Sequence, residues 1–165
     1  MNRRRLIKLM GVAAITHIAG HSVFAQQGEE RVKVDRVDLS MEEWRKRLTP
    51  EQFHVLREEG TEVAGSSPLL QEKRQGTFIC VACDNPLFSS SSKYESGTGW
   101  PSFYDHLPNA VETKTDFKLI WPRTEYHCAR CGGHHGHVFN DGPEPTGLRY
   151  CNNGVVLKFV AGDLS

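Results

Sequence analysis

The sequence predicts a mainly β protein, an antiparallel domain that follows two short helices. From Gly76 onward, short runs of aromatic and β-branched residues alternate with Gly, Pro, Asn and Ser, as in strands joined by tight turns. No helical pattern alternates with these runs, so nothing favours a parallel sheet. At 165 residues the chain can form one domain with its own core. The runs that predict strands are TFICV, LIW, TEYHCA, HHGHVF, LRYC and GVVLKFV.

Two capping boxes predict where the helices begin. Ser40 is followed three residues later by Glu43, whose side chain can return to the Ser40 backbone. Thr49 is followed by Pro50, which suits a first helical position, and by Gln52 in the same return position.

The second helix has an apolar side formed by Phe53, Val55 and Leu56, and Gly60 is expected to end it. We expect both helices to cover the sheet. A partner-binding role for their apolar side chains is the alternative.

The first 25 residues are interpreted as an export signal peptide and are excluded from the fold. They combine a basic start, a weakly apolar middle that is too short to span a bilayer, and small residues before Gln26 at a cleavable spacing. Asn2 to Lys8 resembles a twin-arginine signal, which exports folded proteins. An ordinary secretory signal and an amphipathic arm are the alternatives. We expect a periplasmic or secreted protein with a leader over residues 26–39 and a domain over residues 40–165.

Removal of the signal peptide makes the mature chain mildly acidic. The first 25 residues contain four of the 20 Lys and Arg residues and none of the 20 Asp and Glu residues. No basic stripe remains to hold phosphates, which argues against a nucleic-acid partner.

Four of the five cysteines form two C-x-x-C units, which predict a structural zinc site. Two such units bring four thiolates to a tetrahedral zinc at about 2.3 Å each and leave no open position for chemistry. Two disulfides, as expected in an oxidising compartment, or a redox-active pair are the alternatives. Zinc bound before export would protect the thiols from oxidation. The four predicted ligands are Cys80, Cys83, Cys128 and Cys131.

The fifth cysteine, Cys151, lies in the sequence RYCNN and is the candidate nucleophile. If residues 148–154 form a strand, Arg149, Cys151 and Asn153 point to one face, while Tyr150 and Asn152 point to the other. A guanidinium beside a thiol favours the thiolate. An inert buried cysteine is the alternative.

Histidines and an aromatic loop complete the candidate site. His137 and Phe139 share one face of a predicted strand, with His134 just before them, and a histidine near a thiol can accept and return a proton. The glycine-flexed loop around Trp100 presents an indole. Purely structural roles for the histidines and for Trp100 are the alternatives.

Together these stretches resemble the B-type methionine sulfoxide reductases, which reduce methionine-R-sulfoxide. The resemblance extends in order over roughly residues 41–160. It implies a β-tent, two antiparallel sheets with small helices, stapled by zinc at the four cysteines. It rests on SGTGWPSF (96–103), CVAC, CARC, HHGHVFNDGP (134–143), PTGLRYCNN (145–153), LKF (157–159) and WRKRLTPEQFHVLREEGTE.

The resemblance also implies roles for the site residues. Cys151 would attack the sulfoxide sulfur and become a sulfenic acid. His134 and His137 would hold and protonate the oxygen, with Arg149 and Asn153 around the sulfur. The methionine methyl group would be received by Trp100, with Phe139 behind it. The substrate would be oxidised methionine in proteins or peptides, with free methionine sulfoxide left open, and we expect a monomer.

Two departures from the family pattern affect this interpretation. Many members carry, at the position of Thr98, a cysteine that resolves the sulfenic acid, so Cys151 would need an external reductant. The candidates are a thioredoxin-like protein, a glutaredoxin system and a small thiol. His135 stands where an apolar residue is usual, and we expect it outside the reaction centre.

Two other classes of function are set against the reductase. One is a zinc-ribbon module that binds a partner without chemistry, which would need neither Cys151 nor the histidines. The other is a metalloenzyme with a catalytic ion on histidines drawn from His127, His134, His135 and His137.

Overall fold

The computed structural model describes residues 34–118 and 121–162. The predicted signal peptide and residues 26–33 of the predicted leader therefore lie outside the described residues. Within the described ranges, no helix is long and apolar enough to cross a membrane.

The two predicted helices are present and both capping boxes are confirmed. α1 (Met41–Arg47) has Ser40 as its N-cap, and α2 (Pro50–Glu58) has Thr49 as its N-cap. In both, the cap side chain accepts from the third helical N–H, and the third side chain accepts from the cap backbone.

The end of α2 differs from the prediction. The left-handed residue that ends the helix is Glu59, with φ 55°, and not Gly60. Gly60 follows it and donates its N–H to His54 O over 3.0 Å. A Cβ at Gly60 would lie 2.2 Å from the exposed His54 ring, so a larger residue there would require this ring to move.

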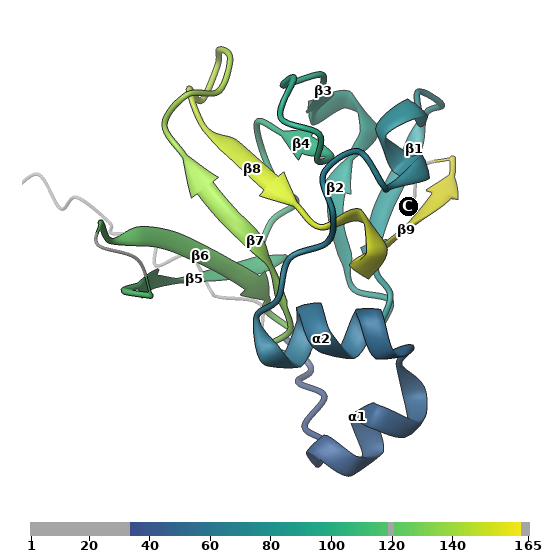
Figure 1. Cartoon of the computed structure of the whole chain (residues 1–165). Helices are drawn as coiled ribbons and strands as arrows, with labels where there is room; N and C mark the ends of the chain where they lie inside the picture. Colours follow the sequence, from purple (N-terminus) through teal and green to yellow (C-terminus); the bar gives the residue numbers. More distant parts are fainter. Residues whose placement is uncertain (1–33, 119–120, 163–165) are drawn as a thin grey trace, which may run out of the picture. The chain divides into compact units, whose positions relative to one another are not determined.

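The remaining elements form two antiparallel sheets, which confirms the predicted fold class (Figure 1). The strands of the first sheet, in spatial order, are β2 (Pro86–Ser89), β1 (Gly76–Cys80) and β9 (Leu157–Ala161). Those of the second are β3 (Lys93–Tyr94), β4 (Ser102–Phe103), β8 (Arg149–Asn152), β7 (His134–Phe139), β6 (Arg123–Cys128) and β5 (Val111–Asp116). Three 3-10 turns join them: η1 (Pro68–Gln71), η2 (Ser90–Ser92) and η3 (Gly154–Val156).

Five of the six predicted runs contain a strand, and the strands β2, β3, β4 and β5 were not among the predictions. The strand predicted for the run LIW is wrong at Trp121, which lies between β5 and β6 and is 79% exposed. The first two residues of this run lie outside the described ranges. The run GVVLKFV begins as η3 and only then becomes β9. β5 was not predicted, because four of its six side chains face solvent and leave no apolar pattern.

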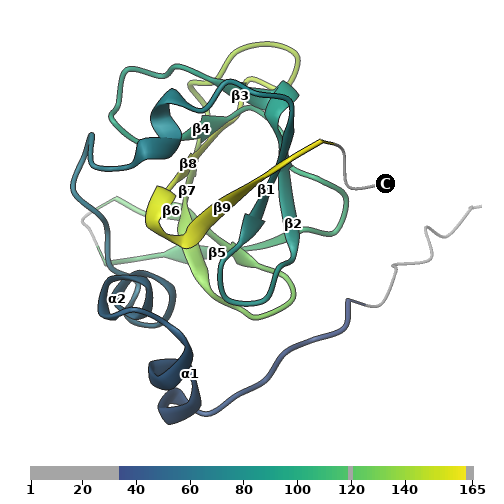
Figure 2. The same cartoon turned by 90° about the vertical axis from the view of Figure 1, so that its right-hand side faces the viewer.

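An aromatic cluster packs the two sheets together. Phe88 of β2 stacks on Phe103 of β4 with ring centroids 4.3 Å apart, and it meets Tyr126 of β6 at 6.1 Å and Tyr150 of β8 at 5.9 Å. Phe78 of β1 meets Phe103 edge to face at 5.0 Å. Figure 2 shows the three-stranded sheet in front of the longer sheet, with the helices at one end.

The described part of the predicted leader packs on the domain. Val37 donates its N–H to Arg130 O over 2.8 Å, and Arg36 forms an ion pair with Glu112 of β5. These contacts hold residues 34–39 beside the second cysteine pair.

Candidate functional site

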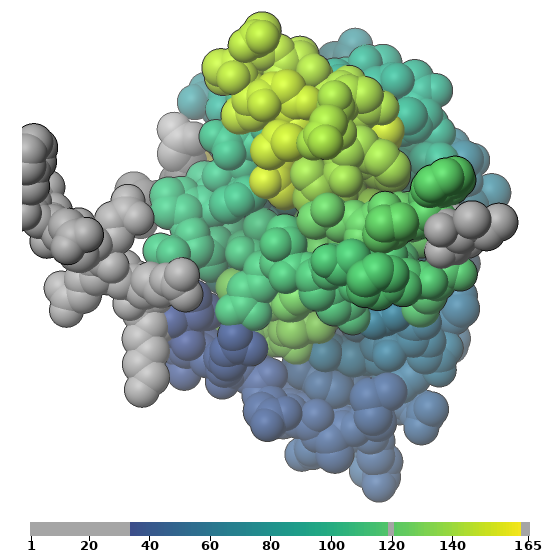
Figure 3. All heavy atoms as spheres, turned by 90° about the vertical axis from the view of Figure 1, so that its left-hand side faces the viewer, coloured from purple at the N-terminus to yellow at the C-terminus, as the bar shows by residue number. Residues whose placement is uncertain are grey.

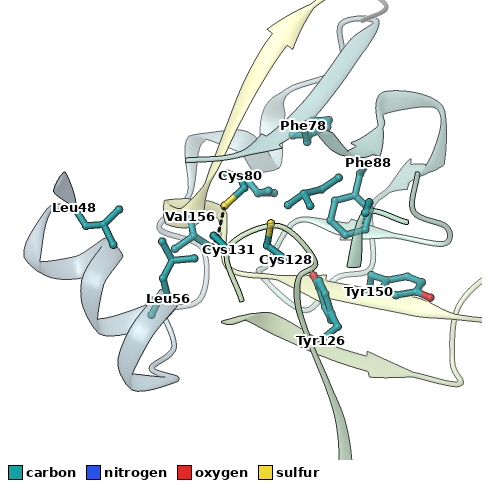
Figure 4. Close-up of a cluster of buried hydrophobic side chains, with 14 of the residues drawn as sticks. Leu48, Leu56, Phe78, Cys80, Phe88, Tyr126, Cys128, Cys131, Tyr150 and Val156 are labelled. Atoms are coloured by element: carbon teal, nitrogen blue, oxygen red, sulfur yellow. Dashed lines mark hydrogen bonds between the residues drawn. The ribbon is translucent and has the colours of Figure 1, made fainter. Parts of the chain in front are cut away.

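The four paired cysteines meet at one point between the two sheets. Cys80 ends β1 in the first sheet, and Cys128 ends β6 in the second. All four sulfur atoms lie within 4.8 Å of one another. Figure 4 shows Cys80 and Cys131 joined by a dashed line, with Leu56 and Val156 beside them. The arrangement is a candidate metal site.

The sulfur separations favour a metal over disulfides. Cys80 and Cys131 lie 3.8 Å apart and Cys83 and Cys128 lie 3.6 Å apart, and none of the five cysteines is in a disulfide. A disulfide would need about 2.05 Å. Tetrahedral coordination with metal–sulfur bonds of about 2.3 Å places the sulfurs about 3.8 Å apart. The donor set therefore fits a tetrahedral thiolate site.

Crowding makes the four thiols ionise unequally. Hydrogen bonds within the cluster, those with Cys128 foremost, raise the pKa of Cys80 well above its usual value and lower the pKa of Cys131. Four adjacent negative charges repel one another, so a bound dication is what allows all four to ionise together.

His135 belongs to this cysteine cluster. It is fully buried, and its Nε2 lies 3.4 Å from Cys80 Sγ while its Nδ1 lies 3.4 Å from Asn152 Oδ1. Burial lowers its pKa to about 4, so its ring is neutral near pH 7. The structure thus places His135 away from Cys151, as expected, and against a predicted metal ligand.

A small cleft of about 140 Å³ lies on the opposite face of β7 and β8. Figure 3 shows a face of the domain with the β5–β6 hairpin in green and the segment between β7 and β8 in yellow-green. The cleft residues are Thr61, Trp100, Arg123, Gly136, His137, Phe139, Cys151, Asn152 and Asn153.

Strand pairing sets the histidine beside the thiol. His137 of β7 is the direct cross-strand partner of Cys151 of β8, so their side chains share one face of the sheet. Gly136, the residue before it, allows the strands to approach: a Cβ there would lie 1.9 Å from Cys151 O. Tyr150 faces the aromatic cluster instead, which confirms the predicted alternation along β8.

Cys151 is a half-buried thiol held near a fixed cation. Arg149 donates two hydrogen bonds to Asp141, over 2.7 and 2.8 Å, and its guanidinium stacks on Phe139 at 4.3 Å. Burial raises the pKa of Cys151 above 9.0, and the charge of Arg149 and hydrogen bonds from Thr98 and Arg149 partly oppose that rise.

Two carboxylates fix the orientation of the two histidines. His137 Nε2 lies 2.8 Å from Asp116 Oδ2, and Arg123 binds the same oxygen over 2.7 Å. Hydrogen bonds, from the Lys118 backbone first and then from His137, hold the pKa of Asp116 far below its usual value, so it remains a carboxylate.

His134 lies behind His137, with ring centroids 5.5 Å apart. Its Nδ1 is 2.8 Å from Glu125 Oε1, and both side chains are almost fully buried. Burial lowers the pKa of His134. A carboxylate on one nitrogen of each ring leaves the other nitrogen for a second partner.

Trp100 and Asn153 form the wall of the cleft next to Thr61. The Trp100 indole Nε1 donates to Glu62 O over 3.2 Å. The Asn153 amide accepts from Glu62 N over 2.9 Å and donates to His135 O over 2.9 Å. Both atoms of this amide are thus engaged within the protein.

The structure brings together five of the seven predicted site residues and places two beside them. Cys151, His137, Asn153, Trp100 and Phe139 line the cleft. Arg149 reaches it through its contact with the Cys151 thiol, and His134 through its contact with the ring of His137. Sequence reasoning missed the carboxylates that hold these groups; the only local signal was the acid in HVFNDGP. They are Asp116, Glu125 and Asp141.

The histidines do not converge on a second metal. His134 faces Glu125, His135 faces Cys80, and His137 faces Asp116. Among the described residues, the four cysteines are the one group of His, Cys, Asp and Glu side chains that could hold an ion. The catalytic-metal interpretation therefore has no geometric support.

A larger groove of about 900 Å³ lies between α2 and β9. Its lining includes apolar side chains such as Val155 and Phe159 and charged ones such as Arg74, and it contains no cysteine. The smaller cleft, which has the thiol and its polar partners, is therefore the better candidate for chemistry.

Comparisons with known proteins show the family of this chain. Residues 48–161 match the SelR domain. The chain is 54% identical over 124 residues to the peptide methionine sulfoxide reductase MsrB of Leptospira interrogans, covering 74% of this chain and 95% of that protein. It is 49% identical over 132 residues to the mitochondrial methionine-R-sulfoxide reductase B2 of Rattus norvegicus, covering 75% of this chain and 76% of that protein.

A longer relative also matches. The chain is 51% identical over 134 residues to the chloroplastic peptide methionine sulfoxide reductase B1 of Arabidopsis thaliana, covering 81% of this chain. The match spans 66% of that longer protein.

The pKa of Cys151 can be measured through its alkylation. Because burial raises this pKa, the midpoint of the pH dependence of the iodoacetamide reaction at Cys151 should lie at higher pH than that of a cysteine in an unstructured peptide. Arg149→Met should shift the midpoint to still higher pH, because the cation that favours the thiolate is lost, whereas Arg149→Lys should retain part of the effect. Mass spectrometry of the Cys151 peptide provides the rates. A midpoint near neutral pH would contradict this assignment.

Proposed function

Because the chain belongs to the SelR-domain family of B-type peptide methionine sulfoxide reductases, we propose that it reduces methionine-R-sulfoxide through Cys151. The pairing of Cys151 with His137 across one cleft is the observation that carries this proposal. The proposed substrate is methionine sulfoxide in proteins or peptides, and the biological role is repair of oxidised proteins.

The reaction transfers one oxygen atom and two electrons. Cys151 sulfur attacks the sulfoxide sulfur, the sulfur–oxygen bond of the substrate breaks, and the oxygen ends on Cys151 as a sulfenic acid. The methionine sulfur is reduced and the cysteine sulfur is oxidised. The sulfur–sulfur bond formed by the attack breaks as the oxygen passes to Cys151, the thiol proton ends on the sulfenic acid, and any proton that a histidine lends to the oxygen returns to that histidine.

The polar groups of the cleft would bind and protonate the sulfoxide oxygen. His137 lines the cleft, and Asp116 binds its Nε2, which leaves Nδ1 to hold and protonate the oxygen. His134 lies behind it and would share that role through its free Nε2. Arg149 stabilises the thiolate as it forms.

The aromatic side of the cleft suits the methionine methyl group. Trp100 and Phe139 both line it and give an apolar surface in an otherwise polar cleft. Asn153 forms the wall beside Cys151, and because its amide is engaged by Glu62 and His135, its role is to shape that wall.

Return of Cys151 to the thiol would require an outside reductant. Thr98, whose hydroxyl reaches the Cys151 sulfur, occupies the position from which a second cysteine could resolve the sulfenic acid. The other four cysteines lie together in the candidate metal site. One external thiol forms a mixed disulfide and releases water, and a second thiol frees Cys151. A thioredoxin-like protein, a glutaredoxin system or a small thiol could supply these electrons.

The proposed cofactor is one structural zinc ion held by Cys80, Cys83, Cys128 and Cys131. Four thiolates close the tetrahedral shell, so the ion supplies folding stability and takes no part in the reaction. His135, whose Nε2 lies 3.4 Å from Cys80 Sγ, would help to fix that ligand from outside the coordination shell.

Export through the first 25 residues completes the proposal. The twin-arginine-like sequence favours a folded, zinc-loaded protein that acts in the periplasm or outside the cell as a monomer. Zinc bound before export would keep the four thiols from forming disulfides in an oxidising compartment.

The first test is turnover of the separate epimers of a peptide methionine sulfoxide with dithiothreitol. The purified chain should reduce the R epimer only, and Cys151→Ser should abolish turnover because the nucleophile is lost. Folding of the variant is checked by circular dichroism. Absence of R-epimer reduction by folded, zinc-loaded protein would instead favour a binding module that has lost the chemistry.

The state of Cys151 after one turnover tests the need for an outside reductant. With sulfoxide and no thiol, mass spectrometry should find a dimedone-trapped sulfenic acid on Cys151 and no disulfide. Thr98→Cys is the matched comparison, and it should form an intramolecular disulfide with Cys151. A disulfide from Cys151 to a cluster cysteine in the unaltered chain would refute the single-cysteine mechanism.

Metal content tests the zinc site. Elemental analysis of the unaltered chain and of Cys151→Ser should find one zinc per chain. Cys80→Ser should lose the metal and more than about 4 kcal/mol of unfolding free energy, because an open thiolate shell binds zinc poorly. Protein recovered from the periplasm with two disulfides and no zinc would count against both the site and its loading before export.

A further inference from the structure

Glu62, which is not one of the predicted site residues, contacts both residues that form the cleft wall, Trp100 and Asn153. Glu62 lies in the segment between α2 and η1, next to Thr61 of the cleft lining. All four of its polar groups form hydrogen bonds. The backbone N–H donates to Asn153 Oδ1, and the backbone carbonyl accepts from Trp100 Nε1.

The Glu62 carboxylate fixes the segment from the other side. Oε1 accepts from Gly154 N over 2.6 Å, and Oε2 accepts from Val155 N over 2.8 Å. These amides begin η3, directly after Asn153. Hydrogen bonds from backbone amides to a carboxylate are charge-assisted and shorter than neutral ones. The carboxylate therefore ties the Glu62 backbone to η3, next to the cleft.

The segment also supports the loop that carries Trp100. Gly65 donates its N–H to Gly99 O over 2.8 Å, and a Cβ at Gly99 would lie 3.1 Å from Ala64. With the indole bond to Glu62, the loop around Trp100 is held at two points by residues 62–65.

We infer that Glu62 is a positioning residue that sets the substrate selectivity of the cleft. Its carboxylate anchors residues 61–65 to η3, and its backbone then fixes the Trp100 indole and the Asn153 amide relative to each other. The inference rests on the proposed function, since Trp100 is the surface assigned to the methyl group. Glu62 itself touches neither the Cys151 thiol nor the histidine pairs in the hydrogen bonds described.

Kinetics with Glu62→Gln provide the first test. Glutamine keeps the size but presents an NH₂ group to a backbone N–H, so one anchor is lost and the other loses its charge. The KM for the R epimer of a peptide sulfoxide should rise about tenfold, and the preference for R over S should fall, while kcat changes little. Glu51→Gln is the control, because it removes a carboxylate from the same larger groove that Glu62 lines, and the hydrogen bonds to Gly154, Val155, Trp100 and Asn153 come from Glu62.

Double mutants show whether the effect passes through Trp100. Trp100→Phe removes the indole N–H, so adding Glu62→Gln to it should raise KM by much less than it does in the unaltered chain. The Cys151 alkylation rate should be the same in Glu62→Gln and Glu51→Gln as in the unaltered chain, because neither substitution removes a contact of the thiol. Equal KM values for Glu62→Gln and Glu51→Gln, or full additivity with Trp100→Phe, would overturn the inference.

A measurement without substrate separates failure of this inference from failure of the proposed reaction. The chain has three tryptophans, so its ¹⁵N-labelled indole spectrum should have three signals, and Trp100→Phe identifies one of them. In Glu62→Gln that signal should shift or broaden, and its N–H should exchange faster with solvent, because Glu62 O is no longer held in place. An unchanged Trp100 signal would refute the positioning role even if the enzyme is active.

Discussion

The meeting of four thiols between the two sheets is the constraint on which the rest of the structure depends. Cys80 ends a strand of one sheet and Cys128 ends a strand of the other, so a single point ties both sheets together at the end nearest α2. α2 is bound to the same point, because Arg57 donates to Cys131 O over 2.9 Å and stacks on Trp44 at 4.0 Å. Four ionised thiols would repel one another, so a cation bound among them would stabilise the arrangement. The aromatic cluster around Phe88 then fills the space between the sheets away from this point.

The strand β8 connects this core to the cleft by simple alternation. Tyr150 faces the aromatic cluster and Asn152 contacts His135, which in turn lies against Cys80. Arg149 and Cys151 point the other way, toward the cleft. A shift of one residue in the register of β8 would place the thiol in the core and Tyr150 in the cleft. The register is held by pairing with β7, and that pairing requires Gly136 because a side chain there would collide with the Cys151 carbonyl.

Local patterns were enough to predict the helices, the cysteine cluster and the face on which Cys151 lies. Capping boxes, C-x-x-C spacing and strand alternation each act over a few residues, and they survive in the folded chain because burial reinforces them. The strands β2 to β5 were not predicted. β5 is mostly exposed, β3 and β4 have two residues each, and β2 has only two buried apolar residues, so each of them forms a strand only through its neighbours. The partners of the site residues were also beyond prediction. Glu62 contacts Asn153 across 91 positions of sequence and His135 contacts Cys80 across 55, and no local spacing encodes such pairs.

The environment of Cys151 restricts the reactivity of this thiol, which has no second cysteine beside it. Burial raises its pKa, and the thiol form reacts slowly with oxidants because the thiolate is the nucleophile. Arg149 opposes this rise in pKa. Because its charge is paired with Asp141, it does not fully offset the effect of burial. In the proposed reaction, a sulfoxide whose oxygen is bound by His137 would bring an electrophilic sulfur next to the thiol and an oxygen that takes up protons as the thiolate forms. The reactivity of Cys151 would then depend on bound substrate. On this proposal, the fit of the methyl group against Trp100, which Glu62 would adjust, would control selectivity and the activation of the nucleophile together.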